Sequence, residues 1–368
     1  MGPALGFVWL LREKLHRMVW AVPCHGCVLV QAKPSQLSRD FCRADASLLP
    51  RQLGRVGPVR GDPARAPFTF GSVQACRLAT VEVSVRVLAN DFSDSALLLI
   101  GHGSTVNDDS AATTHQHAAA IRSRGIFAEV REAFFKIEPR IGAVLAAISQ
   151  RRLFVVPLFV SEGYFTRQAI PCELGLPAGS QDIMPCRVEI SGKQVIYCPP
   201  VGTHPLMTEI ILARAREVLG AATSAASDEI ALVIAGHGTA LNADSRKSIE
   251  RQVELIAARR LFAEVWPAFL EESPRIGEIP NFVQSKRVVV VPFFMSDGLH
   301  VREDIPVLLG ETEATVQTRL SAGEWPWRNP TTTQGKEIYY TRGVGGESGI
   351  AEVILERVRD AASIFGPA

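Results

Sequence analysis

The sequence lacks any apolar run of about 18 residues, the length that a membrane-spanning helix requires. It also lacks an excess of charge of either sign, because 39 Lys and Arg stand against 38 Asp and Glu, for a net charge of +1. A near-neutral chain of ordinary composition, 47% hydrophobic and 21% charged, is typical of a globular protein. Its 368 residues are enough for two domains. We therefore expect neither nucleic acid nor a membrane among its partners.

Cysteine is scarce, and its distribution argues against a disulfide framework. The seven cysteines are odd in number, show no framework spacing, and none follows Cys198. We expect reduced thiols and a cytoplasmic location. Cys24 and Cys27 form a lone C-x-x-C, which would be half of a metal or cluster site. No second pair matches it, so incidental thiols are the favoured interpretation.

The small net charge hides a basic N-terminal extension. Residues 1–90 contain 12 Lys and Arg but 5 Asp and Glu, whereas the remainder contains 27 and 33. Residues 33–70 are rich in Pro, Arg, Gly and Ser without a sustained period, which predicts a disordered linker. The apolar stretch before Arg12 is short for a signal segment and carries no clear cleavage signature. Residues 1–90 are thus interpreted either as a disordered extension or as the product of a start codon placed too far upstream.

An internal duplication occupies the rest of the chain. Residues 96–103 read ALLLIGHG and residues 230–238 read IALVIAGHG, which places His102 and His237 135 positions apart. The same offset relates Phe-Ala-Glu-Val at 127 to that at 262, Pro-Arg-Ile-Gly at 139 to that at 274, and Val-Pro at 156 to that at 291. Later, Ile196-Tyr197 pairs with Ile338-Tyr339 at an offset of 142. A seven-residue insertion near Trp325–Trp327 is therefore predicted in the second copy.

Each copy alternates short apolar runs with amphipathic stretches. In the second copy the predicted strands are 230–235, 262–266, 288–293 and 338–340, and the predicted helices are 243–259, 273–284 and 349–362. Such alternation predicts the α/β class, with a parallel sheet covered on both faces. We expect two tandem lobes, 91–225 and 226–368, each with a four-stranded parallel sheet flanked by helices. The two lobes are expected to face one another across a cleft.

Three polar side chains follow three predicted strands of the second copy. His237 comes directly after the first strand, Glu271 after the second and His300 after the third. Ligands of open parallel sheets bind at the carboxyl ends of the strands, so these side chains are expected to converge. Two imidazoles and a carboxylate can hold a divalent ion and accept protons. Taken singly, a capping or core histidine and a solvated carboxylate at a helix start remain the alternatives.

The first copy provides an internal comparison. Its matching residues are His102, Lys136 and Phe165. Protonated Lys and Phe cannot ligate a metal, so the first lobe is predicted to be chemically silent. His115 and His117 are two apart on a predicted helix and cannot share a face, and both are expected at the surface.

These features resemble the sirohydrochlorin chelatases of the CbiX/SirB type, of the class II chelatase superfamily. The matching segments are Gly236–Thr239, Phe269–Glu271 with Pro274, and Gly298–Pro306. The last has the form G-x-H-x-x-x-D-I-P. The chain departs from the family at Thr105 and Ala240, where an arginine is common.

The resemblance implies insertion of a divalent ion, cobalt, iron or nickel, into sirohydrochlorin, in cobalamin or sirohaem biosynthesis. His237, His300 and Glu271 would present the metal and take up pyrrole protons, and no tightly bound cofactor is implied. Because the substrate carries carboxylates, four basic residues are candidate clamps, with solvated surface charge as the alternative: Arg246, Lys247, Arg275 and Arg302.

Two other classes of function compete with a chelatase. One is a non-catalytic metal or tetrapyrrole carrier that shares the fold, and the other is a two-lobed receptor of the periplasmic type. The complete trio of His237, Glu271 and His300 argues against both. Turnover distinguishes the carrier, which would bind sirohydrochlorin without metallating it.

Overall fold

The computed structural model describes residues 92–105, 109–220, 229–239 and 243–366. The N-terminal extension, with its predicted linker and the Cys24–Cys27 pair, lies outside the described residues. Within the described part, no helix is both long and apolar enough to cross a membrane.

The first sheet has strand order β2-β1-β3-β5-β4. The first four of these run parallel, and β4 lies antiparallel to β5 at the edge. The strands are β1 (Phe92–Gly101), β2 (Phe127–Phe134), β3 (Arg152–Pro157), β4 (Cys186–Ile190) and β5 (Lys193–Tyr197). The helical segments are α2 (Asp109–Arg122), α3 (Ile141–Ala147), η1 (Phe165–Ala169), α4 (Ile170–Leu174), η2 (Ser180–Asp182), η3 (Val201–Thr203) and α5 (Met207–Leu219).

The second sheet repeats this order as β7-β6-β8-β10-β9, again with four parallel strands and an antiparallel edge strand. Its strands are β6 (Ile230–Gly236), β7 (Glu264–Phe269), β8 (Arg287–Pro292), β9 (Thr331–Thr333) and β10 (Lys336–Tyr340). Its helical segments are α6 (Asp244–Ala257), η6 (Ile276–Glu278), α7 (Ile279–Phe282), η7 (His300–Asp304), α8 (Ile305–Leu308), α9 (Glu313–Ser321), η8 (Val344–Gly346) and α10 (Ile350–Phe365).

The structure confirms two tandem α/β lobes with four parallel strands each. The antiparallel fifth strands, β4 and β9, were not predicted, because they are short and only partly buried. The stretch 273–284 was predicted as one helix, but it forms the two short segments η6 and α7. Pro280 lies at the start of α7, where it has no amide hydrogen to donate to the preceding turn.

The register predicted for the last strands was wrong by one residue. Val195 pairs with Leu153 and Ile338 pairs with Val288, so the equivalent residues are 143 apart rather than 142. The tyrosines at the ends of β5 and β10 agree with this register. The Tyr197 hydroxyl donates to the carbonyl of Thr166, and the Tyr340 hydroxyl donates to the carbonyl of Val301. The second copy is therefore eight residues longer than the first over this region.

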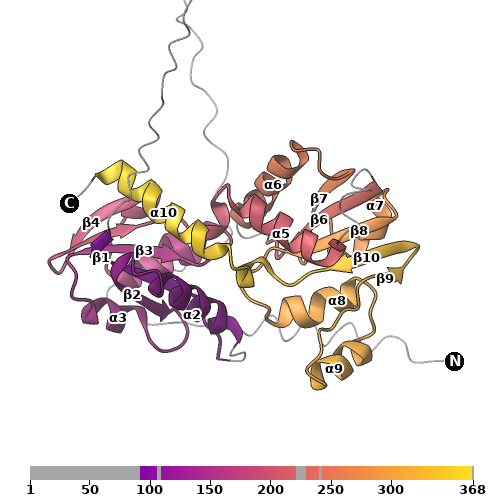
Figure 1. Ribbon diagram of the computed structural model, residues 1–368, viewed down its shortest axis with the longest axis horizontal. Helices are drawn as coiled ribbons and strands as arrows, with labels where there is room; N and C mark the ends of the chain where they lie inside the picture. The colour runs from indigo at the N-terminus through magenta and orange to yellow at the C-terminus, as the bar shows by residue number, and fades with distance from the viewer. Residues whose placement is uncertain (1–91, 106–108, 221–228, 240–242, 367–368) are drawn as a thin grey trace, which may run out of the picture. The chain divides into compact units, whose positions relative to one another are not determined.

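Helices α5 and α10 are exchanged between the two sheets. Helix α5 follows the first sheet in sequence but contacts α6, β8 and β10, whereas α10 follows the second sheet but contacts α2 and β3 (Figure 1). One hydrophobic cluster consequently joins buried residues of both halves, including Phe154 and Ile354. Two smaller clusters cover the opposite face of each sheet.

This exchange explains why the predicted surface position of His117 was wrong. The side chain is buried at 1% exposure, and its Nε2–H donates to the carbonyl of Gly345, 2.7 Å away in the other half of the chain. His115 is exposed as predicted. Helical spacing correctly separated the two faces of α2, but it could not reveal that the second repeat covers one of them.

Candidate functional site

His237 is placed by a tight glycine turn at the carboxyl end of β6. A Cβ at Gly236 would collide with Ile249 of α6, and Gly238 has φ of +65°, which favours glycine. The Nδ1 atom of His237 lies 2.8 Å from the carbonyl oxygen of Gly238. Since a carbonyl only accepts, Nδ1 must carry the proton, and the lone pair of Nε2 is free for a ligand.

Glu271 lies beside His237 because the backbone holds the two segments together. The amide of Glu271 donates to the carbonyl of His237 at 3.1 Å, just beyond the end of β7. The side chains also approach, with 3.8 Å between Glu271 Oε1 and His237 Nε2. Both side chains are about half exposed, at 49% and 43%, so a ligand can reach them from solvent.

His300 begins the wide turn η7 beyond β8. Its ring stands nearly perpendicular to that of His237, with centroids 5.1 Å apart. The Nδ1 atom of His300 lies 2.6 Å from Asp304 Oδ2. The structure thus brings all three predicted residues together at one edge of the second sheet.

The arrangement is open rather than a closed coordination shell. Among the residues that the structure describes, no three His, Cys, Asp or Glu side chains are close enough to form a preformed metal site. Two adjacent imidazoles with one flexible carboxylate could instead take up a borderline divalent ion and release it.

The first sheet has the same backbone arrangement at the matching position, but its side chains there are different. The amide of Lys136 donates to the carbonyl of His102, as Glu271 does to His237. Phe165 stands perpendicular to His102, with ring centroids 4.8 Å apart, and also packs against Phe135 and Phe159. Burial, and secondarily the charge of Lys136, lowers the pKa of His102. A neutral histidine among phenyl rings therefore occupies the place of the trio.

The predicted clamp Arg246 is already engaged. It donates to Glu250 at 2.7 Å and to Glu272 at 3.2 Å, and its guanidinium lies over the ring of Phe269. A substrate carboxylate would have to compete with both glutamates. Arg275 is more exposed, and its side chain contacts the Leu270 carbonyl at 3.4 Å.

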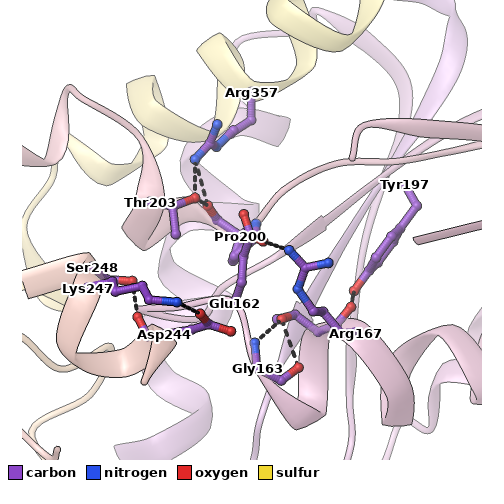
Figure 2. A network of polar contacts seen from close by, with 11 residues as sticks. Glu162, Gly163, Arg167, Tyr197, Pro200, Thr203, Asp244, Lys247, Ser248 and Arg357 are labelled. Atoms are coloured by element: carbon purple, nitrogen blue, oxygen red, sulfur yellow. Dashed lines mark hydrogen bonds and ion pairs between the residues drawn. The ribbon is translucent and has the colours of Figure 1, made fainter. Parts of the chain in front are cut away.

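Lys247 is exposed and forms an ion pair of 3.0 Å with Asp244 (Figure 2). It lines a cavity of about 240 Å³ together with Glu162 and Thr203 from the first half of the chain. Arg302 is partly buried within η7, two residues after His300. Of the two positions where the family commonly has arginine, Thr105 is exposed and Ala240 lies outside the described residues.

The contact of Asp304 with His300 was not predicted, although Asp304 lies in the G-x-H-x-x-x-D-I-P segment. Its spacing of four from His300 is the signal that could have identified it, because residues four apart on a helical turn are neighbours. Phe294, whose ring centroid is 6.0 Å from that of His300, was not predicted either.

Comparison with known proteins identifies the family of the chain. The sequence model of the CbiX family matches residues 96–218 and 231–361, which together make up most of the chain. The chain belongs to the CbiX family. The resemblance drawn from the motifs is thereby confirmed, and both repeats are CbiX units.

Two relatives differ in how much of the chain they match. A probable sirohydrochlorin cobaltochelatase of Halobacterium salinarum is 38% identical over 283 residues, covering 74% of this chain and 94% of the relative. A sirohydrochlorin cobaltochelatase of Methanopyrus kandleri is 30% identical over 139 residues, covering 36% of this chain and 96% of the relative. The second relative therefore corresponds in length to a single CbiX unit.

Solved structures show the same fold. A multi-domain protein of Deinococcus radiodurans with structural similarity to chelatases superposes with a TM-score of 0.59 at 30% identity. The match covers 73% of this chain but only 54% of that protein, which has two additional domains. SirB from Bacillus subtilis, solved with Fe³⁺, gives a TM-score of 0.53 at 17% identity, covering 73% of this chain and 96% of SirB.

Proposed function

We propose that this CbiX protein inserts a divalent metal ion into sirohydrochlorin, using one site formed by His237, Glu271 and His300. The observation that carries the proposal is the placement of two adjacent imidazoles and a carboxylate at one strand edge, 5.1 Å between the rings and 3.8 Å from His237 Nε2 to Glu271 Oε1. The cobaltochelatase names of the relatives support sirohydrochlorin as the substrate.

The ion is a substrate of this reaction, and cobalt, iron and nickel all suit two imidazoles with a carboxylate. His237 and His300 would replace some of its water ligands while remaining neutral. With only two nitrogen donors fixed by the protein, the ion stays exchangeable. The same site can therefore deliver it to the tetrapyrrole nitrogens.

Proton transfer is the second requirement. The free-base macrocycle must lose two pyrrole protons for each divalent ion that enters, which leaves the net charge unchanged. Glu271 is half exposed beside the histidines, so it can accept a proton and pass it to water. We assign it the role of base.

The substrate carboxylates require cations near the site. We propose Lys247, Arg275 and Arg302 as direct contacts. Arg246 would join them only by exchanging its glutamate partners. Lys247 is exposed and pairs with the half-buried Asp244 carboxylate, and the cavity that it lines includes none of His237, Glu271 and His300. Solvated surface charge remains the alternative for each of these residues.

We also propose a cytoplasmic location without a tightly bound cofactor. Within the described ranges Cys186 and Cys198 are buried and form no disulfide, which supports a reducing compartment.

The decisive experiment incubates the purified full chain with sirohydrochlorin and with Co²⁺, Fe²⁺ or Ni²⁺ in turn, and follows the absorbance of the macrocycle. We expect metallation by at least one ion, and its loss in His237→Ala. Binding of sirohydrochlorin with no metallation by any of the three ions would instead identify a carrier.

A further inference from the structure

The two site histidines are held by different kinds of acceptor. His237 donates from Nδ1 to a neutral backbone carbonyl at 2.8 Å, whereas His300 donates from Nδ1 to the Asp304 carboxylate at 2.6 Å. A hydrogen bond to an ionised acceptor is shorter and about twice as strong as one between neutral groups. His300 is therefore the more firmly oriented of the two imidazoles.

The local backbone brings His300 and Asp304 together. Both lie in the wide turn η7, whose closing hydrogen bond runs from the amide of Ile305 to the carbonyl of His300. Such π-helical turns are rare and are often found at functional sites. Each of the two side chains is about 43% exposed, so their contact is not imposed by a crowded core.

The first repeat shows that this turn does not need the aspartate. At the same offset of 135, η1 spans Phe165–Ala169 with the same length and the same closing bond, from Ile170 to Phe165. Phe165 replaces His300, and Ala169 replaces Asp304. The fold thus forms the turn equally well without the pair. The aspartate is present in the repeat that has the histidine, and the backbone of the turn does not depend on it.

We propose that Asp304 is a positioning residue for metal binding by His300, an inference that rests on the proposed function. Its carboxylate keeps the proton on Nδ1 and fixes the ring orientation, which leaves the Nε2 lone pair available to the incoming ion. Carboxylates that hold a ligating histidine in this way typically contribute about 10–100-fold to metal affinity.

The variants Asp304→Ala and Asp304→Asn test this role in the full-length protein. Alanine removes the acceptor. Asparagine keeps the shape but can turn its amide donor toward Nδ1, which would favour the tautomer that blocks Nε2. Glu303→Gln is the matched control, because it removes a charge from the residue next to Asp304. The Glu303 carboxylate accepts a hydrogen bond from the side chain of Gln317.

Two measurements are made on each variant without sirohydrochlorin. The first is the affinity for Co²⁺ alone. The second is the tautomer of His300, read from ¹⁵N–¹H correlations of the imidazole and assigned with His300→Gln. We expect Co²⁺ binding weaker by about 10–100-fold in both Asp304 variants, with the His300 proton no longer confined to Nδ1. Glu303→Gln should match the parent in both.

Co²⁺ affinity within twofold of the parent, with an unchanged tautomer, would overturn the assignment. If Asp304→Ala fails to fold, the near-isosteric Asp304→Asn carries the test, and its thermal unfolding is recorded beside that of the parent. Metallation assays keep the two proposals distinguishable. A parent that binds Co²⁺ but never metallates sirohydrochlorin refutes the proposed function while leaving the role of Asp304 measurable.

Discussion

Phe165 stands at 88° to the imidazole of His102, with ring centroids 4.8 Å apart. In the second repeat His300 takes the place of Phe165 and stands at 78° to His237, with centroids 5.1 Å apart. The two copies of this sheet edge therefore hold a pair of rings in similar geometry, although the rings themselves differ in chemistry. The duplication provides a built-in control for every test of the site.

Replacing either histidine of the second repeat should abolish metal insertion. His237→Ala and His300→Ala each remove a nitrogen ligand from a half-exposed position, so the fold should be retained while activity falls by about 100-fold or more. Metallation rate and circular dichroism measure the two effects. His115→Ala, an exposed histidine elsewhere, is the control. Parental rates in both site variants would show that the site is misassigned.

Glu271→Gln should lower turnover more than metal affinity. The amide keeps the shape of the side chain but cannot accept a pyrrole proton, and loss of a general base typically costs about 100-fold or more in rate. Metallation kinetics and Co²⁺ titration separate the two quantities. Weakened Co²⁺ binding with unchanged turnover would make Glu271 a plain ligand.

His102→Ala should cost little activity, although the equivalent change at His237 is expected to be severe. His102 is surrounded by Phe159 and Phe165, and no carboxylate replaces Glu271 at the matching position, which is Lys136. The measurement is the visible spectrum of the Co²⁺-loaded protein. A spectral change in His102→Ala would place this imidazole in the coordination sphere.

Rebuilding the trio in the first repeat should create a second metal site. The combined change Lys136→Glu, Phe165→His and Ala169→Asp restores at an offset of 135 the residues Glu271, His300 and Asp304. The wide turn that must carry the new pair already exists there. Equilibrium dialysis with Co²⁺ should then detect one more bound ion per chain than in the parent. Unchanged stoichiometry would mean that the retained backbone is insufficient.

Stability should decline below about pH 6.5, in part because of His117. Burial lowers the pKa of His117, and the same cause dominates for His102 and His204. The unfolded chain, with histidine pKa near 6.5, then binds more protons than the folded one. The free energy of unfolding is therefore fully maintained above that pH and decreases as the pH falls toward the folded-state pKa values.

His117→Gln should weaken this pH dependence, because glutamine does not titrate. The matching position of the second repeat already has a glutamine, Gln252. Urea denaturation at pH 7.5 and pH 5.5 gives the difference in unfolding free energy between the two conditions. His115→Gln, at an exposed position of the same helix, should behave as the parent does. An equal loss in the parent and His117→Gln would exclude a contribution from His117.

Much of the site could be read from the sequence because parallel sheets impose a simple rule. The strands at 230, 264 and 287 end beside one another, so residues just past them must meet. His237, Glu271 and His300 satisfy this rule without any knowledge of distances. Their roles remain predictions, as do the basic clamps and the two lobe boundaries.

The sequence by itself determined the duplication, the α/β class and the strand-end trio, since periodicity and the 135-residue offset are properties of the chain alone. Only the tertiary structure decided the exchange of α5 and α10, the burial of His117, the one-residue correction of the last strands and the contact of Asp304 with His300. The physical reason is common to all four. Each depends on which partner a side chain or strand contacts. Hydrophobic periodicity indicates that a face is buried, but it does not indicate which part of the chain covers that face.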